Sequence, residues 1–154
     1  MRKSSILTSF AAAAASVVLA AGPALAGNAH FIASATEITS SGTELTVKFK
    51  EAGLESGSTS TIQVSAHLDM TVQCVNGGNK VPSDPKKTTI SSDVSNSGEF
   101  TAAKNGNLTG SLSVSAPSAA SVLDCPGGQK ATTTELIWSN VSIDDLDTGA
   151  HLDL

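Results

Sequence analysis

The sequence predicts an all-β protein built as a single antiparallel β-sandwich of about seven or eight strands. Residues 61–74 alternate apolar and polar side chains without interruption. Turn-forming residues recur about every 8 to 12 positions over much of the chain, as short antiparallel strands require. No segment after residue 26 carries the apolar spacing of an ordinary helix. These patterns favour an immunoglobulin-like or Greek-key arrangement.

The N-terminus reads as a secretory signal peptide, residues 1–26. A basic start, an apolar alanine-rich stretch and a small-residue cleavage motif follow one another, at Arg2-Lys3, 6–21 and Ala24-Leu25-Ala26. Cleavage after Ala26 leaves one domain, residues 27–154, which is long enough for a core of its own. We therefore expect a secreted, extracellular protein.

Composition excludes several classes of partner. Loss of Arg2 and Lys3 with the signal takes the formal net charge from −5 to −7, which disfavours nucleic-acid binding. No apolar run in 27–154 approaches the roughly 20 residues of a membrane span. With Tyr 0, Trp 1 and Phe 4 in the whole chain, stacked recognition of sugars or bases is disfavoured too.

The strongest strand signal lies in residues 61–75. A period of two places every second side chain on a buried face and the others in water. The expected buried set is Ile62, Val64, Ala66, Leu68, Met70, Val72 and Cys74. The opposite face is expected to be polar and exposed, and it includes His67 and Asp69.

Further strands are expected on either side of this segment. Their ranges are 31–38, 44–50, 88–95, 99–102, 108–116 and 133–143. Turn-prone sequences separate them at 40–43, 96–98 and 105–107. Within 133–143, Ile137 is expected to share a face with Val141 and Ile143.

The two cysteines, Cys74 and Cys125, are expected to form one disulfide, as an even pair in an exported protein does. A catalytic or metal-binding thiol is the alternative, but the spacing lacks the neighbouring ligands of a zinc set. Each cysteine precedes a Gly-Gly turn and a lysine, in the long connections 75–87 and 117–130. The bridge would bring these two connections to one end of the sandwich.

This end carries the candidate binding residues Asn76, Asn79, Lys80 and Lys130. Backbone N–H groups at Gly-Gly turns, together with lysines, can receive an anionic or carbonyl-rich ligand, and long loops on a rigid scaffold often carry function. The alternative is that both connections are plain turns, stapled because they are long.

Other chemistry-bearing residues form no recognised motif. His67 and Asp69 point the same way and could act as an acid–base pair, with ordinary surface residues as the alternative. Residues 144–147 gather three carboxylates, for which we expect a frayed acidic tail, with calcium ligation as the alternative. No nucleophile elbow or phosphate loop is present, so we expect no enzyme, no catalytic residue, no metal and no cofactor.

Two resemblances add to this interpretation. The segments Asn28-Ala29-His30-Phe31, 49–54 and Cys74-Val75-Asn76-Gly77-Gly78-Asn79 resemble small secreted β-sandwich proteins of actinomycete-type bacteria, a group without an assigned activity. Leu45-x-Val47, Gly53-Leu54 and Gly57-Ser58 resemble the neocarzinostatin-type apochromoproteins, exported immunoglobulin-like sandwiches that hold a small chromophore. The chain departs from the latter in having one cysteine pair rather than two and few aromatic residues.

The expected function is that of a secreted, non-enzymatic binding protein or cell-surface component, with an extracellular ligand or cell-surface partner. The alternatives are a protease inhibitor acting through a disulfide-flanked loop and an apochromoprotein-like carrier of a small molecule. A hydrolase using His67 and Asp69 is a further alternative.

Overall fold

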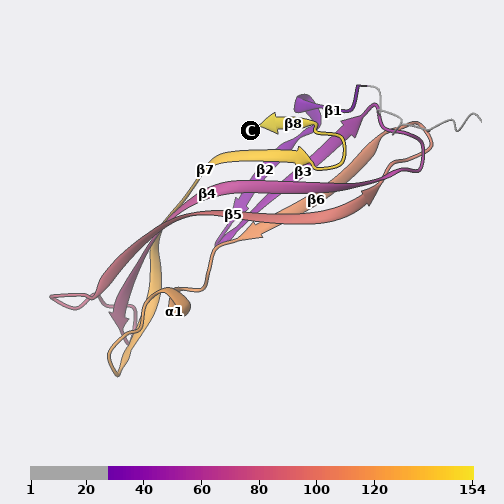
Figure 1. Ribbon diagram of the computed structural model, residues 1–154. Coiled ribbons are helices and arrows are strands. Elements are labelled where there is room, and N and C mark those ends of the chain that lie inside the picture. The colour runs from indigo at the N-terminus through magenta and orange to yellow at the C-terminus, as the bar shows by residue number, and fades with distance from the viewer. Residues whose placement is uncertain (1–27) are drawn as a thin grey trace, which may run out of the picture.

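The computed structural model describes residues 28–154, which form two antiparallel β-sheets (Figure 1). The proposed signal peptide lies outside the described residues. The strands are β1 (His30–Phe31), β2 (Glu37–Ser41), β3 (Glu44–Ala52), β4 (Thr59–Asn76), β5 (Lys87–Thr101), β6 (Leu108–Ser115), β7 (Gln129–Asp145) and β8 (His151–Asp153). The helical segments are a 3₁₀ turn, Ala33–Ala35, and α1 (Ala119–Val122). Across residues 28–154, every helix is too short to cross a bilayer.

The first sheet is centred on β3, which pairs with β1 and β2 along one side and with β6 along the other. The second sheet has the order β5-β4-β7-β8. The expected hairpin turn before residue 44 joins β2 to β3, with Gly42 at φ 59°. The prediction of an all-β, two-sheet protein of about eight strands with one disulfide is confirmed.

The buried face of β4 is the one that the alternation predicts. All seven expected side chains from Ile62 to Cys74 are at most 2% exposed. Those nearer the N-terminal end of β4 pack between the two sheets, together with Val47, Phe49 and Ile143. Burying a side chain of this size contributes about 1.5–3 kcal/mol, so this face anchors the second sheet.

The second sheet extends well beyond the first, and this gives the molecule two parts (Figure 1). We call the part where the two sheets face each other the body, and residues 70–90 and 116–136 the distal lobe. The lobe has its own small core of Met70, Val72, Cys74 and Leu123, which Leu68 extends into the body, and α1 and its flanking loop pack against this core. The lobe therefore depends on β4, β5 and β7 for its position.

One expected turn is wrong. Residues 96–98 do not separate two strands, because β5 runs unbroken from Lys87 to Thr101 and pairs with β4 throughout. Glycine suits position 98 because a Cβ atom there would lie only 3.2 Å from the side chains of both Leu112 and Phe100, which leaves little room for a larger residue. The long ladder on β4 overrides the local turn preference of these residues.

The expected faces of β7 are also wrong in part. The register between β4 and β7 shifts between Ser65/His67 and again between Thr71/Val72. Near the first shift Asn140 has φ 48°, as an extra residue in a bulged strand does. The bulge reverses the alternation, so Ile137 is 50% exposed although Ile143 is buried.

Candidate functional site

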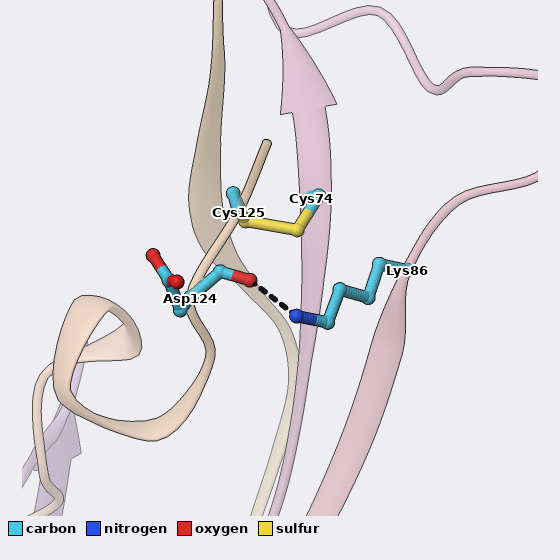
Figure 2. Close-up of a disulfide and its surroundings, with 4 residues drawn as sticks. All are labelled: Cys74, Lys86, Asp124 and Cys125. Atoms are coloured by element: carbon cyan, nitrogen blue, oxygen red, sulfur yellow. Dashed lines mark hydrogen bonds between the residues drawn. A yellow bond between two sulfur atoms is a disulfide. The ribbon is translucent and has the colours of Figure 1, made fainter. Parts of the chain in front are cut away.

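The disulfide fixes the end of the distal lobe. Cys74 on β4 is bonded to Cys125, which lies between α1 and β7, with their Cα atoms 5.7 Å apart (Figure 2). Beside the bridge, Lys86 Nζ donates a hydrogen bond of 2.7 Å to the backbone carbonyl oxygen of Asp124 (Figure 2). The expected pairing of the two cysteines is therefore confirmed, and a second contact ties the same two loops together.

The two Gly-Gly turns lie side by side beyond the disulfide. Val75 is paired with Lys130 and Asn76 with Gln129, so β4 ends where β7 begins. The first turn closes through a 2.8 Å hydrogen bond from the Asn76 N–H to the Lys80 carbonyl oxygen. We call residues 76–81 and 126–130 the tip. The expected placement of both connections at one end of the molecule is confirmed.

The four candidate binding residues are all exposed at this tip. Asn76, Asn79 and Lys80 belong to one turn, and Lys130 is the second residue of β7. Asn79 has φ 60° and Gly78 φ 81°, a left-handed backbone that Asn and Gly tolerate better than other residues. The turn is therefore encoded by its sequence and holds its amide groups in place.

Charge is distributed unevenly between the two parts. The distal lobe holds four of the seven lysines of residues 28–154, at positions 80, 86, 87 and 130, against three acids, at 84, 124 and 135. The body holds the other three lysines and eleven acids. Within residues 28–154 the one lysine–carboxylate ion pair is Lys48–Glu37, in the body. The lobe is thus the less acidic end of an acidic molecule.

A second cluster of functional groups lies on the outer face of the second sheet. His67 on β4 is opposite Asp93 on β5, and its Nδ1 lies 2.6 Å from the Asp93 carboxylate. Its Nε2 lies 2.9 Å from Ser91 Oγ and 3.8 Å from the Asp69 carboxylate. The hydrogen bond to Asp93 is the main cause that raises the pKa of His67 above its usual value. We call these four residues the His67 cluster.

This arrangement has the connectivity of a serine nucleophile, a histidine base and an orienting carboxylate. The cluster spans β4 and β5 on the face of the sheet that points away from the core. Asp69 adds a negative charge beside Ser91, its partner in the register, which opposes the build-up of an oxyanion. The geometry supports proton exchange at His67 more readily than acyl transfer at Ser91.

A matching cluster surrounds His151 on β8. Its Nδ1 lies 2.6 Å from the Asp144 carboxylate and its Nε2 3.1 Å from that of Asp153. Both carboxylates raise the pKa of His151, Asp144 more strongly. Over residues 28–154, no three His, Cys, Asp or Glu side chains form a group suited to a metal ion.

The expectation of a frayed acidic tail is wrong. Asp145 is 1% exposed, and its Oδ1 accepts hydrogen bonds from the backbone N–H groups of Asp147 and Thr148 at 2.8 and 3.2 Å. Asp147 in turn accepts a 2.6 Å hydrogen bond from the Thr61 N–H. The chain then continues into β8, because the carboxylates cap a turn rather than repel one another into solvent.

An open cleft of about 280 Å³ lies where the first sheet ends against β7. It is lined by Gly42, Thr43, Thr133, Thr134, Glu135 and Leu136. This lining offers hydroxyl groups and one carboxylate but no aromatic ring. It therefore lacks the aromatic side chains that commonly line a small-molecule pocket.

Sequence reasoning missed two groups of residues at these sites. Ser91 and Asp93 could not be assigned to His67, because only the β4–β5 register brings them together. Glu51 was missed although it continues the alternation of Leu45, Val47 and Phe49. Comparison of the chain with protein-family models, with curated proteins and with solved structures finds no match.

Proposed function

We propose that this protein is a secreted, non-enzymatic binding protein that attaches to an anionic polymer of the cell surface through its tip. One observation carries the proposal. The disulfide and the β4–β7 pairing hold two Gly-Gly turns, each followed by a lysine, side by side at the least acidic end of the molecule. Repulsion by the acidic body would orient the molecule tip-first toward such a surface.

The tip and the adjoining Lys87 combine backbone amide donors with lysine charges. Lys87 is opposite Gln73 and Lys130 is opposite Val75, so the two lysines flank β4 on the same face of the sheet. Lys80 stands at the end of the adjoining turn. Backbone N–H groups in turns and lysine ammonium groups both bind phosphate oxygens, which makes a phosphodiester polymer the best-matched ligand.

Binding to inorganic polyphosphate, measured by isothermal titration calorimetry at low salt, tests this proposal. Replacing Lys80 and Lys130 by Ala should weaken binding tenfold or more, since each lysine near an anionic surface contributes about 1 kcal/mol. Lys50→Ala/Lys104→Ala is the matched control, because it removes the same charge from the body. Equal affinity in the two double variants, or no binding by the wild type, would contradict the proposal.

Export is part of the same proposal. A disulfide is typical of proteins that fold outside the reducing cytosol, and the N-terminal sequence has the three parts of a signal peptide. We also propose that the β-sandwich is immunoglobulin-like. Protein recovered from the culture medium should begin at Gly27, and a mature chain that retains residues 1–26 would contradict export by this route.

A second candidate function is the hydrolysis of activated esters at the His67 cluster, although Asp69 beside Ser91 opposes an oxyanion there. The Ser91–His67 and His67–Asp93 distances are those of a nucleophile–base relay. Release of p-nitrophenol from p-nitrophenyl acetate should then fall to the background rate in Ser91→Ala. The same rate in wild type and Ser91→Ala would exclude Ser91 as a nucleophile.

A further inference from the structure

Two carboxyl groups from opposite sheets are buried in the body. Glu51, near the end of β3, is 0% exposed, and Asp145, the last residue of β7, is 1% exposed. Their partners in the registers are apolar, with Leu108 and Ile62 among them. Two ionised carboxylates in such surroundings would be strongly unfavourable, because each loses its hydration and repels the other.

The hydrogen bonds leave three oxygen atoms of this pair without a donor. Asp145 Oδ1 accepts two backbone N–H groups, but Asp145 Oδ2 and both Glu51 carboxyl oxygens have no partner. Buried polar atoms are nearly always hydrogen-bonded. One proton on Glu51, donated to Asp145 Oδ2, would supply a hydrogen bond and remove one of the two charges.

The electrostatics agree with a proton on Glu51. Burial, and next the charge of Asp145, raise the pKa of Glu51 to about 8, with a smaller opposing effect from the Thr148 hydroxyl. Asp145 Oδ1 already accepts two backbone N–H groups, whereas neither Glu51 oxygen has a donor, so the proton is better placed on Glu51. Glu51 therefore carries the proton at neutral pH.

The other titratable side chains on the surrounding strands either bind partners other than Glu51 or point away from it. His30 of β1 contacts the Asn28 carbonyl oxygen, Asp147 accepts the Thr61 N–H, and His151 of β8 lies between two aspartates. Lys50 alternates to the opposite side of β3 from Glu51. The charge that acts on Glu51 is that of Asp145.

We propose that Glu51 and Asp145 share a single proton that latches the C-terminal segment, residues 145–154, onto the first sheet. Asp145 anchors the turn at its start, through its side chain and through backbone hydrogen bonds with Gly149 and Ala150. Beyond this turn, β8 pairs with β7 over three residues only. Transfer of the shared proton to hydroxide leaves two neighbouring carboxylates, and the C-terminal segment, which begins at Asp145 and ends in the short β8, is the part that moves to hydrate them.

Carbon-13 NMR of the glutamate carboxyl groups, recorded on residues 27–154 between pH 3 and 10, tests the latch. The Glu51 resonance should titrate far above the range of exposed glutamates, and the amides of Asp147 and Thr148 should lose hydrogen-exchange protection over the same pH range. Glu51→Gln should retain that protection throughout, whereas Glu55→Gln, the control at an exposed site, should behave as the wild type. Titration of Glu51 near pH 4.5, or loss of protection in Glu51→Gln at the wild-type pH, would overturn the latch.

Asp145→Asn keeps the experiment decisive if Glu51→Gln does not fold. With Asp145 neutral, the pKa of Glu51 should fall, and an unchanged Glu51 titration would show that the two groups do not share a proton. The last measurement compares the melting temperature with and without 5 mM calcium. A rise in melting temperature of the wild type that is absent in Glu51→Gln would show that the pair holds a cation instead, and would also overturn the latch.

Discussion

Phe49 of the first sheet meets Phe100 of the second edge to face, with ring centroids 5.2 Å apart and an interplanar angle of 84°. Phe31 adds a second edge-to-face contact to Phe49, at 6.1 Å. Such pairs contribute about 0.5–1.5 kcal/mol beyond their burial. Phe49 and Phe100 therefore join the two sheets of the body, and Phe31 supports Phe49 from within the first sheet.

Gly110 makes this aromatic contact possible. A Cβ at position 110 would lie 2.5 Å from a Phe100 ring carbon and 2.7 Å from a Phe49 ring carbon, which no packed core accommodates without movement. Gly110→Ala should lower the free energy of unfolding by about 1–3 kcal/mol in urea denaturation. Gly127→Ala, where a Cβ meets nothing within 4 Å, is the control and should stay near the wild type. Equal stability of the two variants would show that the rings are not constrained.

Removal of the disulfide should loosen the distal lobe. Cys74 and Cys125 are 51 positions apart, and closing a loop of this size stabilises a fold by about 4 kcal/mol in the chain-entropy model. Cys74→Ala/Cys125→Ala should be less stable by roughly that amount, and its amide protection should fall first at the β4–β7 pairs near the tip. Retained protection there, with the loss spread over the body, would contradict the division into two parts.

Glu51 should make the protein less stable as the pH rises. Its pKa is raised from 4.5 to about 8 in the folded chain, so the folded state holds a proton that the unfolded state has lost. The stabilisation is complete below pH 4.5 and is lost as the pH passes through about 8, with a slope of at most about 1.4 kcal/mol per pH unit. Urea denaturation of Glu51→Gln should lack this slope. An identical pH dependence in wild type and variant would contradict the assignment.

Asp93 should control the titration of His67. Asp93→Asn removes the carboxylate that holds the imidazolium and should lower the pKa of His67 toward 6.5, as measured by proton NMR. Because the folded pKa is raised, this contact stabilises the fold below about pH 6.5 and ceases to do so as the pH rises through the higher value. Asp153→Asn is the control, since it should lower the pKa of His151 and leave His67 unchanged. A shift of His67 in the control variant would indicate a long-range charge effect instead.

The sequence was sufficient for features that depend on local patterns. The alternation from Ile62 to Cys74 requires one buried face, and all seven apolar side chains assigned to it are buried. On the opposite face Thr71 departs from the expected exposure, because it is 5% exposed. The same pattern placed His67 and Asp69 on the outer face, where both are partly exposed. The single cysteine pair made the disulfide and the meeting of its two loops predictable.

Features that depend on register could not be predicted in this way. Asp93 contacts His67 only because β5 pairs with β4 over its full length, including residues 96–98, which by themselves favour a turn. The exposure of Ile137 follows from the bulge near Asn140, and no local pattern announces a one-residue insertion. The charge of Asp145 acts on Glu51 because two sheets pack face to face and bring together strands far apart in the sequence.

The attachment of ligand at the tip is tested most directly by NMR mapping of the amide groups during titration with inorganic polyphosphate. The account predicts shifts concentrated at residues 76–81 and 126–130, with the neighbouring amides at Lys86 and Lys87 next in size. Shifts concentrated on the outer face around His67, or spread evenly over the body, would contradict it.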